Sequence, residues 1–511
     1  MKFKKMLNVL GISAFLLSGA LTSCGGSNNN IKDDLQYDEY GDPIFDNVEL
    51  NVLSVIGKPD NEYLSRVNTM FNDFYKENGL KANITSVENA DFYTQLANMI
   101  NTDPDNAPDV VIIHSEYLTK LAHDNIIVPM DEYYEALKNN TFKKTDYIQN
   151  LMNECMYQDK IYGVPLDVHA GVRYVREDIL NKNGLKKPTN LNELVSTCNA
   201  LIEKYNAGEL YTRQMNKNNP SACEWTNAKV FGDSYSPVVM SSAGGIENGW
   251  IPQTAVFQNG GTLTDDKGKP AWNTQGLKDT MQMFRDWQSG ESTLKDNNGK
   301  NRFDYKGKFV SNDNDANTVW SKLSKGEAVF SCEGPWWSKS RLDEYNSVLG
   351  EKVDADGNKF KPLGIMNMSK LYAFDQTKDY ADDIYGVGHC FAITRTVQSK
   401  TKRVGAALYS EFMTKNAIQY LEGGHLPACK AILESEQYKE QPFYEEYLKE
   451  FGSPENFKML GNTPYYSQVY EKLKDVYIDT FTESKNNISI SDLVDTRYNE
   501  ALKEIDSLED L

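Results

Sequence analysis

The side chains able to carry out metal, redox or covalent chemistry are few and widely separated in this sequence. Its five histidines form no H-x-x-H or H-E-x-x-H pair, and Cys155, Cys198, Cys223, Cys332, Cys390 and Cys429 form no C-x-x-C motif. No G-x-S-x-G, P-loop or Rossmann fingerprint is present. With 73 Asp and Glu residues, carboxylate pairs arise by chance and indicate no glycosidase. We therefore predict no catalytic set, no metal site and no cofactor, and we expect a protein that is not an enzyme.

The remaining cysteine, Cys24, stands at the end of an export signal. A basic segment, Met1–Lys5, precedes an apolar stretch that is too short to span a bilayer. The ending Leu21-Thr22-Ser23-Cys24 resembles the lipobox of bacterial lipoproteins, which implies that Cys24 becomes the first mature residue and carries two acyl chains. We expect residues 1–23 to be a signal peptide and 24–46 a flexible tether. The protein is then anchored by lipid on the extracytoplasmic face of the cell membrane.

Length and charge restrict the fold class and the partners. The 511 residues exceed one compact core, so two or more domains are expected. A hydrophobic share of 40% with 11% aromatic residues indicates a folded protein. The formal net charge of −19 repels nucleic acid and anionic lipid head groups. We therefore expect no nucleic-acid partner.

Strands and helices alternate between residues 48 and 114. The pattern predicts strands at 48–52, 82–87 and 109–114, and helices at about 60–76 and 91–101. Leu64, Val67, Phe71 and Phe74 would form the apolar face of the first helix. This order is typical of a doubly wound α/β sheet, in which ligands bind beyond the carboxyl ends of the strands. Here those ends are 56–60 and 114–117.

A second α/β region follows. We expect short strands at 161–165 and 172–175, a helix over 191–202 with Cys198 in the core, a hairpin over 260–272 and a helix over 276–287. The segment from 205 to 250 is polar and poorly periodic. It predicts an elaborated loop region beside the binding site.

From about residue 48 to 475 the chain resembles the family 1 extracellular solute-binding proteins of ABC importers, the sugar-binding group that includes maltodextrin-binding proteins. Four stretches carry this resemblance, and their order and spacing match as well. They are Pro108–Ile113; Tyr162–Pro165 with Tyr174–Leu180, Asn183–Leu185 and Pro188–Leu194; Lys325–Phe330 with Gly334-Pro335-Trp336; and Gly386–Ile393 with Ala406–Phe412 and Gly423–Ala428.

The resemblance implies a two-lobed α/β fold of the periplasmic-binding-protein type (type II), with the ligand in a cleft between the lobes. The first lobe would hold residues 47–167 and 391–428, and the second 169–385 and 430–511. Hinge crossings would fall near Val168, near 386–390 and just after Ala428. Gly386 and Gly388 suit a hinge that absorbs backbone rotation, or could be turn glycines.

A sugar offers hydroxyls that need directed hydrogen bonds and a flat C–H face that stacks on an aromatic ring. By resemblance, Trp336 would stack on the sugar, with burial in the core as the alternative. Tyr470 falls where the family often has a second aromatic residue, and Trp250 aligns with another ring position. Trp337 is a further aromatic residue, with a core position as its alternative.

Polar ligands of the sugar are also implied. Glu116 and Tyr117 match a pair that binds hydroxyls. His169 matches a crossing position where maltodextrin binders carry Glu, and could equally be a hydrogen-bonded hinge histidine. The remaining candidates are Lys58, Asp60 and Asn259, of which Asp60 could be only a helix cap and Asn259 a turn residue. For Asp167 and Arg173 a surface ion pair is favoured.

The leading hypothesis is a monomeric, lipid-anchored receptor that captures a mono- or oligosaccharide by lobe closure and delivers it to an ABC permease. One alternative is the same scaffold binding a non-sugar solute such as a peptide or a polyamine. Another is an extracellular glycoside-processing enzyme, which product formation from oligosaccharides would reveal.

Overall fold

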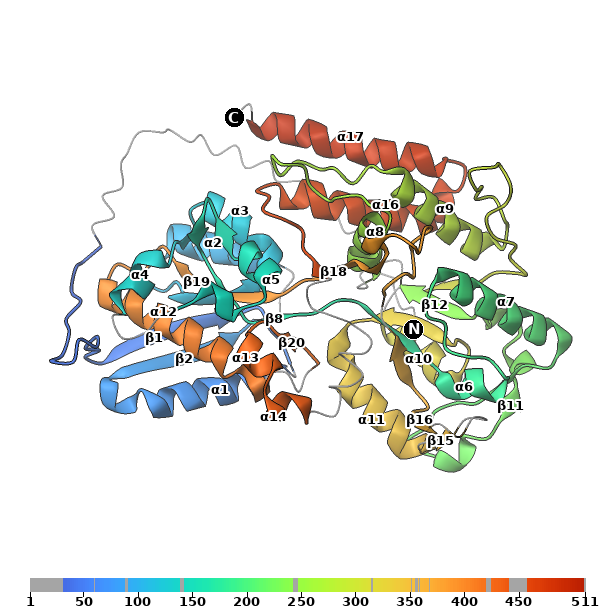
Figure 1. Ribbon diagram of the computed structural model, residues 1–511, viewed down its shortest axis with the longest axis horizontal. Coiled ribbons are helices and arrows are strands. Elements are labelled where there is room, and N and C mark those ends of the chain that lie inside the picture. Colours follow the sequence, from blue (N-terminus) through green and yellow to red (C-terminus); the bar gives the residue numbers. More distant parts are fainter. Residues whose placement is uncertain are drawn as a thin grey trace, which may run out of the picture.

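The computed structural model describes residues 31–58, 60–87, 91–137, 142–241, 247–313, 316–350, 352–353, 357, 359–366, 368–419, 424–440 and 457–509. The predicted signal peptide, Cys24, the tether as far as residue 30 and Gly423 lie outside the described residues. Within the described part of the chain, none of the helices combines the length and the apolar character that crossing a membrane requires. Figure 1 shows two α/β bodies side by side, with several chain segments running between them.

The first body is built on a six-stranded sheet. The order is β2-β1-β3-β19-β4, and β7 also pairs with β19. β1 is parallel to β2 and β3, whereas β19 is antiparallel to β3, β4 and β7. The strands are β1 (Val48–Ser54), β2 (Leu80–Ser86), β3 (Val110–His114), β4 (Ile127–Val128), β7 (Val164–Pro165) and β19 (His389–Thr394). The sequence-predicted strands at 48–52, 82–87 and 109–114 are confirmed.

Helices cover this sheet because each carries an apolar stripe at helical spacing. In α1, Leu64, Val67 and Phe71 are buried, and α12 packs on both α1 and β19. The helices of this body are α1 (Asp60–Phe74), α2 (Phe92–Thr102), α3 (Leu118–His123), α4 (Asp131–Ala136), α5 (Gln149–Glu154) and α12 (Lys400–Lys415). Two short helices, α13 (Lys430–Leu433) and α14 (Glu436–Lys439), follow α12 in the chain.

The second body contains a five-stranded sheet in the order β13-β12-β14-β9-β17. β12 is parallel to β13 and β14, and β9 is antiparallel to β14 and β17. The strands are β9 (Val172–Val175), β12 (Val238–Ser241), β13 (Val310–Asp313), β14 (Phe330–Glu333) and β17 (Gly364–Met366). Its helices are α6 (Glu177–Lys182), α7 (Leu191–Ala207), α8 (Glu247–Gln258), α9 (Gln275–Ser289), α10 (Ala316–Lys325), α11 (Ser338–Leu349), α16 (Lys472–Phe481) and α17 (Ile490–Glu509).

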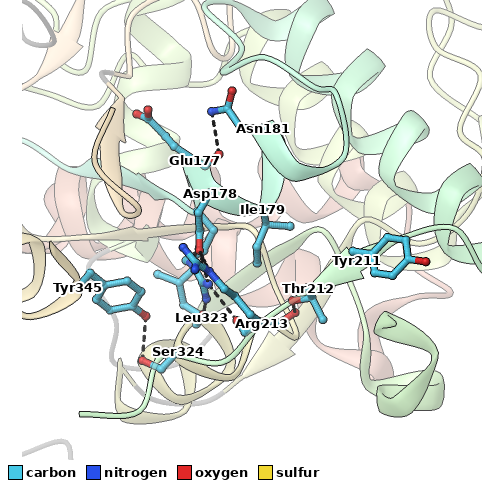
Figure 2. A network of polar contacts seen from close by, with 12 residues as sticks. Glu177, Asp178, Ile179, Asn181, Tyr211, Thr212, Arg213, Leu323, Ser324 and Tyr345 are labelled. Atoms are coloured by element: carbon cyan, nitrogen blue, oxygen red, sulfur yellow. Dashed lines mark hydrogen bonds and ion pairs between the residues drawn. The ribbon is translucent and has the colours of Figure 1, made fainter. Parts of the chain in front are cut away.

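A buried ionic network holds α6 in the second body (Figure 2). Asp178 accepts hydrogen bonds from Nε and Nη2 of Arg176, each at 2.9 Å, and from Nε of Arg213 at 2.7 Å. Arg176 also donates to the carbonyl of Leu323 at 2.8 Å. Two guanidinium groups are therefore compensated by one buried carboxylate and by backbone carbonyls.

Three chain crossings meet between the two bodies (Figure 1). β8 (Asp167–Val168) pairs with β20 (Leu426–Pro427), and His169 forms a bridge with Val387. The crossings are thus hydrogen-bonded to one another. At Gly388 a Cβ atom would lie 2.4 Å from the carbonyl oxygen of Asp167. Close approach of two crossings is the reason for glycine at this position.

Several sequence predictions are wrong in detail. Phe74 is 67% exposed rather than buried, because it is the last residue of α1, at the end of the apolar stripe. The region 205–250 is not only loop, since it supplies β12, a buried strand inside the second sheet. The expected hairpin at 260–272 is present but short: Thr264 forms an antiparallel bridge with Pro270. Two backbone hydrogen bonds of 2.9 Å flank this bridge, from the Asp265 N–H to the Lys269 carbonyl and from the Ala271 N–H to the Leu263 carbonyl. The expected strand at 161–165 is divided between β6 (Lys160–Ile161) and β7.

Candidate functional site

Four of the five histidines meet where the crossings converge. Asp167 and His169 lie on the first crossing, His389 on the second and His425 directly before β20 on the third. His114, the last residue of β3, pairs with His389 in the sheet. The side chains of Asp167, His169, His389 and His425 are buried. Strand pairing between distant segments thus gathers polar groups that the sequence separates.

Asp167 is the centre of this cluster. Its Oδ1 accepts a hydrogen bond from the backbone N–H of His389 at 2.7 Å, and its carboxylate oxygens lie 3.0 Å from Nδ1 of the same histidine. Its Oδ2 lies 2.8 Å from Nδ1 of His425, whose Nε2 lies 3.1 Å from Oδ2 of Asp60. Asp60, at the start of α1, is therefore joined to the crossings through His425.

For Asp167 and His425, burial and the charges of neighbouring groups shift the pKa in opposite directions. Burial disfavours the charge of Asp167, but His389 and His425 outweigh it and hold the pKa of this carboxyl well below its usual range. Burial also opposes the charge of His425, yet Asp167 and Asp60 raise the pKa of this imidazole to about 10. Burial lowers the pKa of His169 well below its ordinary value. At neutral pH the His425 imidazolium therefore faces the Asp167 carboxylate, beside a neutral His169.

Two tryptophans flank His169. The ring of Trp250, on α8, lies 5.8 Å from the imidazole, and the ring of Trp336 lies 5.7 Å from it. The two indoles are 5.8 Å apart at 78°. Trp336 is half-buried, and its ring lies over Gly334, where a Cβ atom would be 2.3 Å from the indole. The glycine of the Gly-Pro-Trp motif thus lets the indole fold back toward the junction.

A stack of tyrosines extends the aromatic surface on the other side. The rings of Tyr93 and Tyr117 are 3.6 Å apart, those of Tyr117 and Tyr466 are 4.0 Å apart, and those of Tyr466 and Tyr470 are 5.1 Å apart. Tyr93 Oη lies 3.0 Å from Nδ1 of His114, which is next to His389. One continuous aromatic band therefore runs from Tyr470 through the histidines to Trp336.

A neutral carboxyl group lies beside the tyrosine stack. Burial, with smaller contributions from Glu154 and Glu471, raises the pKa of Glu116 to about 8. Its Oε2 is buried and makes no hydrogen bond to any described residue. At neutral pH Glu116 can both donate and accept a hydrogen bond, as a sugar hydroxyl requires.

The structure brings seven of the predicted site residues to this junction. The members are Asp60, Glu116, Tyr117, His169, Trp250, Trp336 and Tyr470. Lys58 is exposed on the loop before α1. Asn259 binds the backbone instead, donating to the carbonyls of Ala255 and Tyr372, each at 2.9 Å. Among the described side chains, no contact joins Lys58 or Asn259 to the seven residues at the junction.

Two further predictions need correction. Asp167 and Arg173 are both completely buried, so they form no surface ion pair. Asp167 faces the histidines, whereas Nη2 of Arg173 donates to Tyr372 Oη at 2.8 Å. Trp337, for which a core position was the alternative, is 36% exposed beside Arg341.

Sequence reasoning missed His114, His389 and His425 because no short motif joins them. The available signal was indirect: the predicted crossings near 386–390 and after 428 already placed His389 and His425 next to the hinge. Two surface pockets, of about 660 and 700 Å³, lie elsewhere, and no predicted site residue lines either. The geometry at the junction suits noncovalent binding of a solute with both flat apolar and hydroxyl-like surfaces.

Comparison with known proteins gives one family. The family described as "Bacterial extracellular solute-binding protein" matches residues 69–446, which is most of the chain. A comparison with curated protein sequences gives no match.

Several solved structures share the fold. The sugar-binding protein MalE from Xanthomonas citri has a TM-score of 0.63 at 14% identity, covering 90% of this chain and 99% of its own. The GacH receptor of Streptomyces glaucescens, solved unliganded and with acarbose, has a TM-score of 0.61 at 12% identity, covering 89% and 98%. The substrate-binding protein Lmo0181 from Listeria monocytogenes, in complex with cycloalternan, has a TM-score of 0.59 at 14% identity, covering 90% and 99%. At identities of 12–14%, the similarity shows that the two-lobed fold is shared.

Proposed function

This chain belongs to the bacterial extracellular solute-binding proteins, and from that premise we propose that it captures a mono- or oligosaccharide and delivers it to an ABC permease. In this proposal the lobes comprise residues 47–167 with 391–428 and residues 169–385 with 430–511. The protein acts as a monomer, anchored by lipid at Cys24, and performs no covalent chemistry on its ligand.

The observation that carries the proposal is the aromatic band at the lobe junction. Trp250 and Trp336 present indole rings at 78° to each other, and Tyr117 and Tyr470 continue the band. Aromatic faces bind the C–H surface of a pyranose. Glu116 and the Asp60–His425 pair supply directed hydrogen-bonding groups next to these rings. A sugar needs this combination of surfaces, whereas a purely apolar or purely ionic solute does not.

Solved proteins of the same fold support a carbohydrate ligand. The three named above are described as sugar-binding, as bound to acarbose and as bound to cycloalternan. We carry this ligand class to the present chain as part of the proposal.

Contacts between the lobes supply the mechanism of the proposal. The ring of Tyr117 packs against that of Tyr466 at 4.0 Å, the Gly461 N–H donates to Glu154 Oε1 at 2.7 Å, and Asn150 donates to the Phe457 carbonyl at 2.6 Å. These contacts exist only when the lobes are together. A ligand that binds both lobes therefore shifts the population toward this closed arrangement, which the permease recognises.

A thermal-shift screen against saccharides, peptides and polyamines tests the proposal. At a ligand concentration of about 100 Kd, binding to the folded state contributes about 2.7 kcal/mol and raises the melting temperature. We expect a rise with one class of saccharide that is lost in Trp336→Ala. Trp337→Ala removes the adjacent but exposed indole and serves as the matched control. A rise with peptides or polyamines alone would overturn the carbohydrate assignment, as would an equal sugar response in the two variants.

A further inference from the structure

The buried cluster at the crossings contains four groups with metal-binding atoms. Asp167, His169, His389 and His425 each offer one such atom, and these atoms all lie within 4.8 Å of one another. Asp167 Oδ2 is 2.8 Å from Nδ1 of His425, 3.0 Å from Nδ1 of His389 and 3.9 Å from Nδ1 of His169. All three imidazole nitrogens thus converge on one carboxylate.

An independent observation concerns His169. Its side chain is 3% exposed, and its Nδ1 makes no hydrogen bond to any described residue. A buried polar atom left without a partner destabilises the folded state. Because this nitrogen faces the Asp167 carboxylate at 3.9 Å, a cation placed between them would give Nδ1 of His169 a partner.

The donor set selects the class of cation. Three imidazole nitrogens and one carboxylate oxygen form a four-ligand set of the kind that Zn²⁺ prefers. Ca²⁺ and Mg²⁺ prefer sites made only of oxygen atoms. We propose that Asp167, His169, His389 and His425 form a binding site for a transition-metal dication of the zinc type at the junction of the three crossings.

Zinc binding requires only small movements of the four side chains. Zn–N bonds of about 2.0–2.1 Å place tetrahedral ligands about 3.3 Å apart. Donor atoms within 4.8 Å of one another reach this separation by rotation of the side chains and slight approach of the crossings. Each of the three crossings contributes at least one ligand, so the bound ion joins the crossings directly. This site does not depend on which solute the protein captures.

Asp60 has the position of a residue that orients a ligand. Its Oδ2 lies 3.1 Å from Nε2 of His425, on the ring edge away from Asp167. A carboxylate that accepts a hydrogen bond from Nε2–H leaves Nδ1 of the same ring to bind a metal, which displaces the proton that Nδ1 of the imidazolium carries. Asp60 is therefore a positioning residue of the proposed site rather than a ligand.

Calorimetric titration with ZnCl₂ tests the site. The mature chain, purified without a histidine tag and treated with a chelator, should bind about one equivalent of zinc and should not bind calcium or magnesium. His169→Gln should weaken zinc binding at least tenfold, and Asp60→Asn about 10- to 100-fold. The fifth histidine provides the matched control: His123 is on the surface with 56% of its side chain exposed, and His123→Gln should bind zinc unchanged.

A variant could lose zinc binding because it does not fold, so a spectroscopic measurement on the unaltered chain provides a second test. Co²⁺ in a tetrahedral site of nitrogen and oxygen ligands gives strong visible absorption, which zinc should displace with the same stoichiometry. Failure of the unaltered chain to bind zinc, or equal zinc affinity in His169→Gln and His123→Gln, would overturn the proposal. Because the metal alone is the probe, neither result depends on the sugar screen.

Discussion

Glu154 offers a direct test of how burial controls charge between the lobes. It is the last residue of α5, is 4% exposed, and accepts a hydrogen bond from the Gly461 N–H of the other lobe at 2.7 Å. Burial outweighs this hydrogen bond and raises the pKa of the carboxyl to about 7. Glu154→Gln retains an oxygen that accepts from Gly461 but cannot ionise.

Proton linkage determines whether the protonation of Glu154 stabilises the folded protein at low or at high pH. The folded protein holds a proton on Glu154 up to about pH 7, whereas the unfolded chain releases it near pH 4.5. The stabilisation is fully present below the unfolded pKa and is lost as the pH rises through the folded one. At about 1.4 kcal/mol per pKa unit, the total is about 3 kcal/mol. About 2.5 kcal/mol of it disappears between pH 5 and pH 8.

Urea unfolding of the natural chain and of Glu154→Gln, each at pH 5 and pH 8, measures this effect. The free energy of unfolding of the variant, relative to that of the natural chain, should increase by about 2.5 kcal/mol from pH 5 to pH 8. A buried carboxyl that Glu154 does not influence, such as Glu333, titrates equally in both proteins and cancels in the comparison. Glu116 does not cancel fully, because the charge of Glu154 makes a small contribution to its raised pKa.

Glu436→Gln is the matched control, because the side chain of Glu436 is 82% exposed. Its stability relative to the natural chain should not change with pH. If the difference between Glu154→Gln and the natural chain stays constant from pH 5 to pH 8, the carboxyl is already ionised when folded, and our account of the junction is wrong.

Three further outcomes are expected. Asp178→Asn leaves two buried guanidinium groups without a carboxylate and should lower the free energy of unfolding in urea by about 3–5 kcal/mol; an exposed counterpart, Asp304→Asn, should leave the urea midpoint unchanged. Gly388→Ala places a Cβ atom 2.4 Å from a backbone oxygen and should cost about 1–3 kcal/mol, and an unchanged melting temperature would show that the crossings can separate freely. Cys24→Ala should move the protein from the membrane fraction to the soluble fraction on immunoblots, and persistence in the membrane fraction would argue against lipidation at Cys24.

Elements with strong local periodicity were predictable from the sequence. β1 and α7 carry their apolar residues at strand or helix spacing, and their burial follows from that spacing alone. The strand at Val238–Ser241 was missed, because a fully buried strand is a short apolar run and this one lies in a polar segment. Local sequence does not specify which sheet such a run enters.

The aromatic part of the site was predictable, and its histidine cluster was not. Trp336 and Trp250 occupy positions that the family pattern indicated, and they do lie together. His389 and His425 acquire their neighbours only when β19 pairs with β3 and β20 pairs with β8. Such long-range pairing leaves no spacing signal, so five scattered histidines gave no indication that four of them meet.

The interleaving of the two sheets also constrains the order in which the chain can fold. All strands of the second sheet lie between Val172 and Met366, whereas the first sheet receives β19 only from residue 389. The helices α16 and α17, which pack on the second body, follow still later. A nascent chain therefore completes neither lobe until its last 120 or so residues are available. Such nonlocal assembly slows folding and prolongs the exposure of unpaired strand edges.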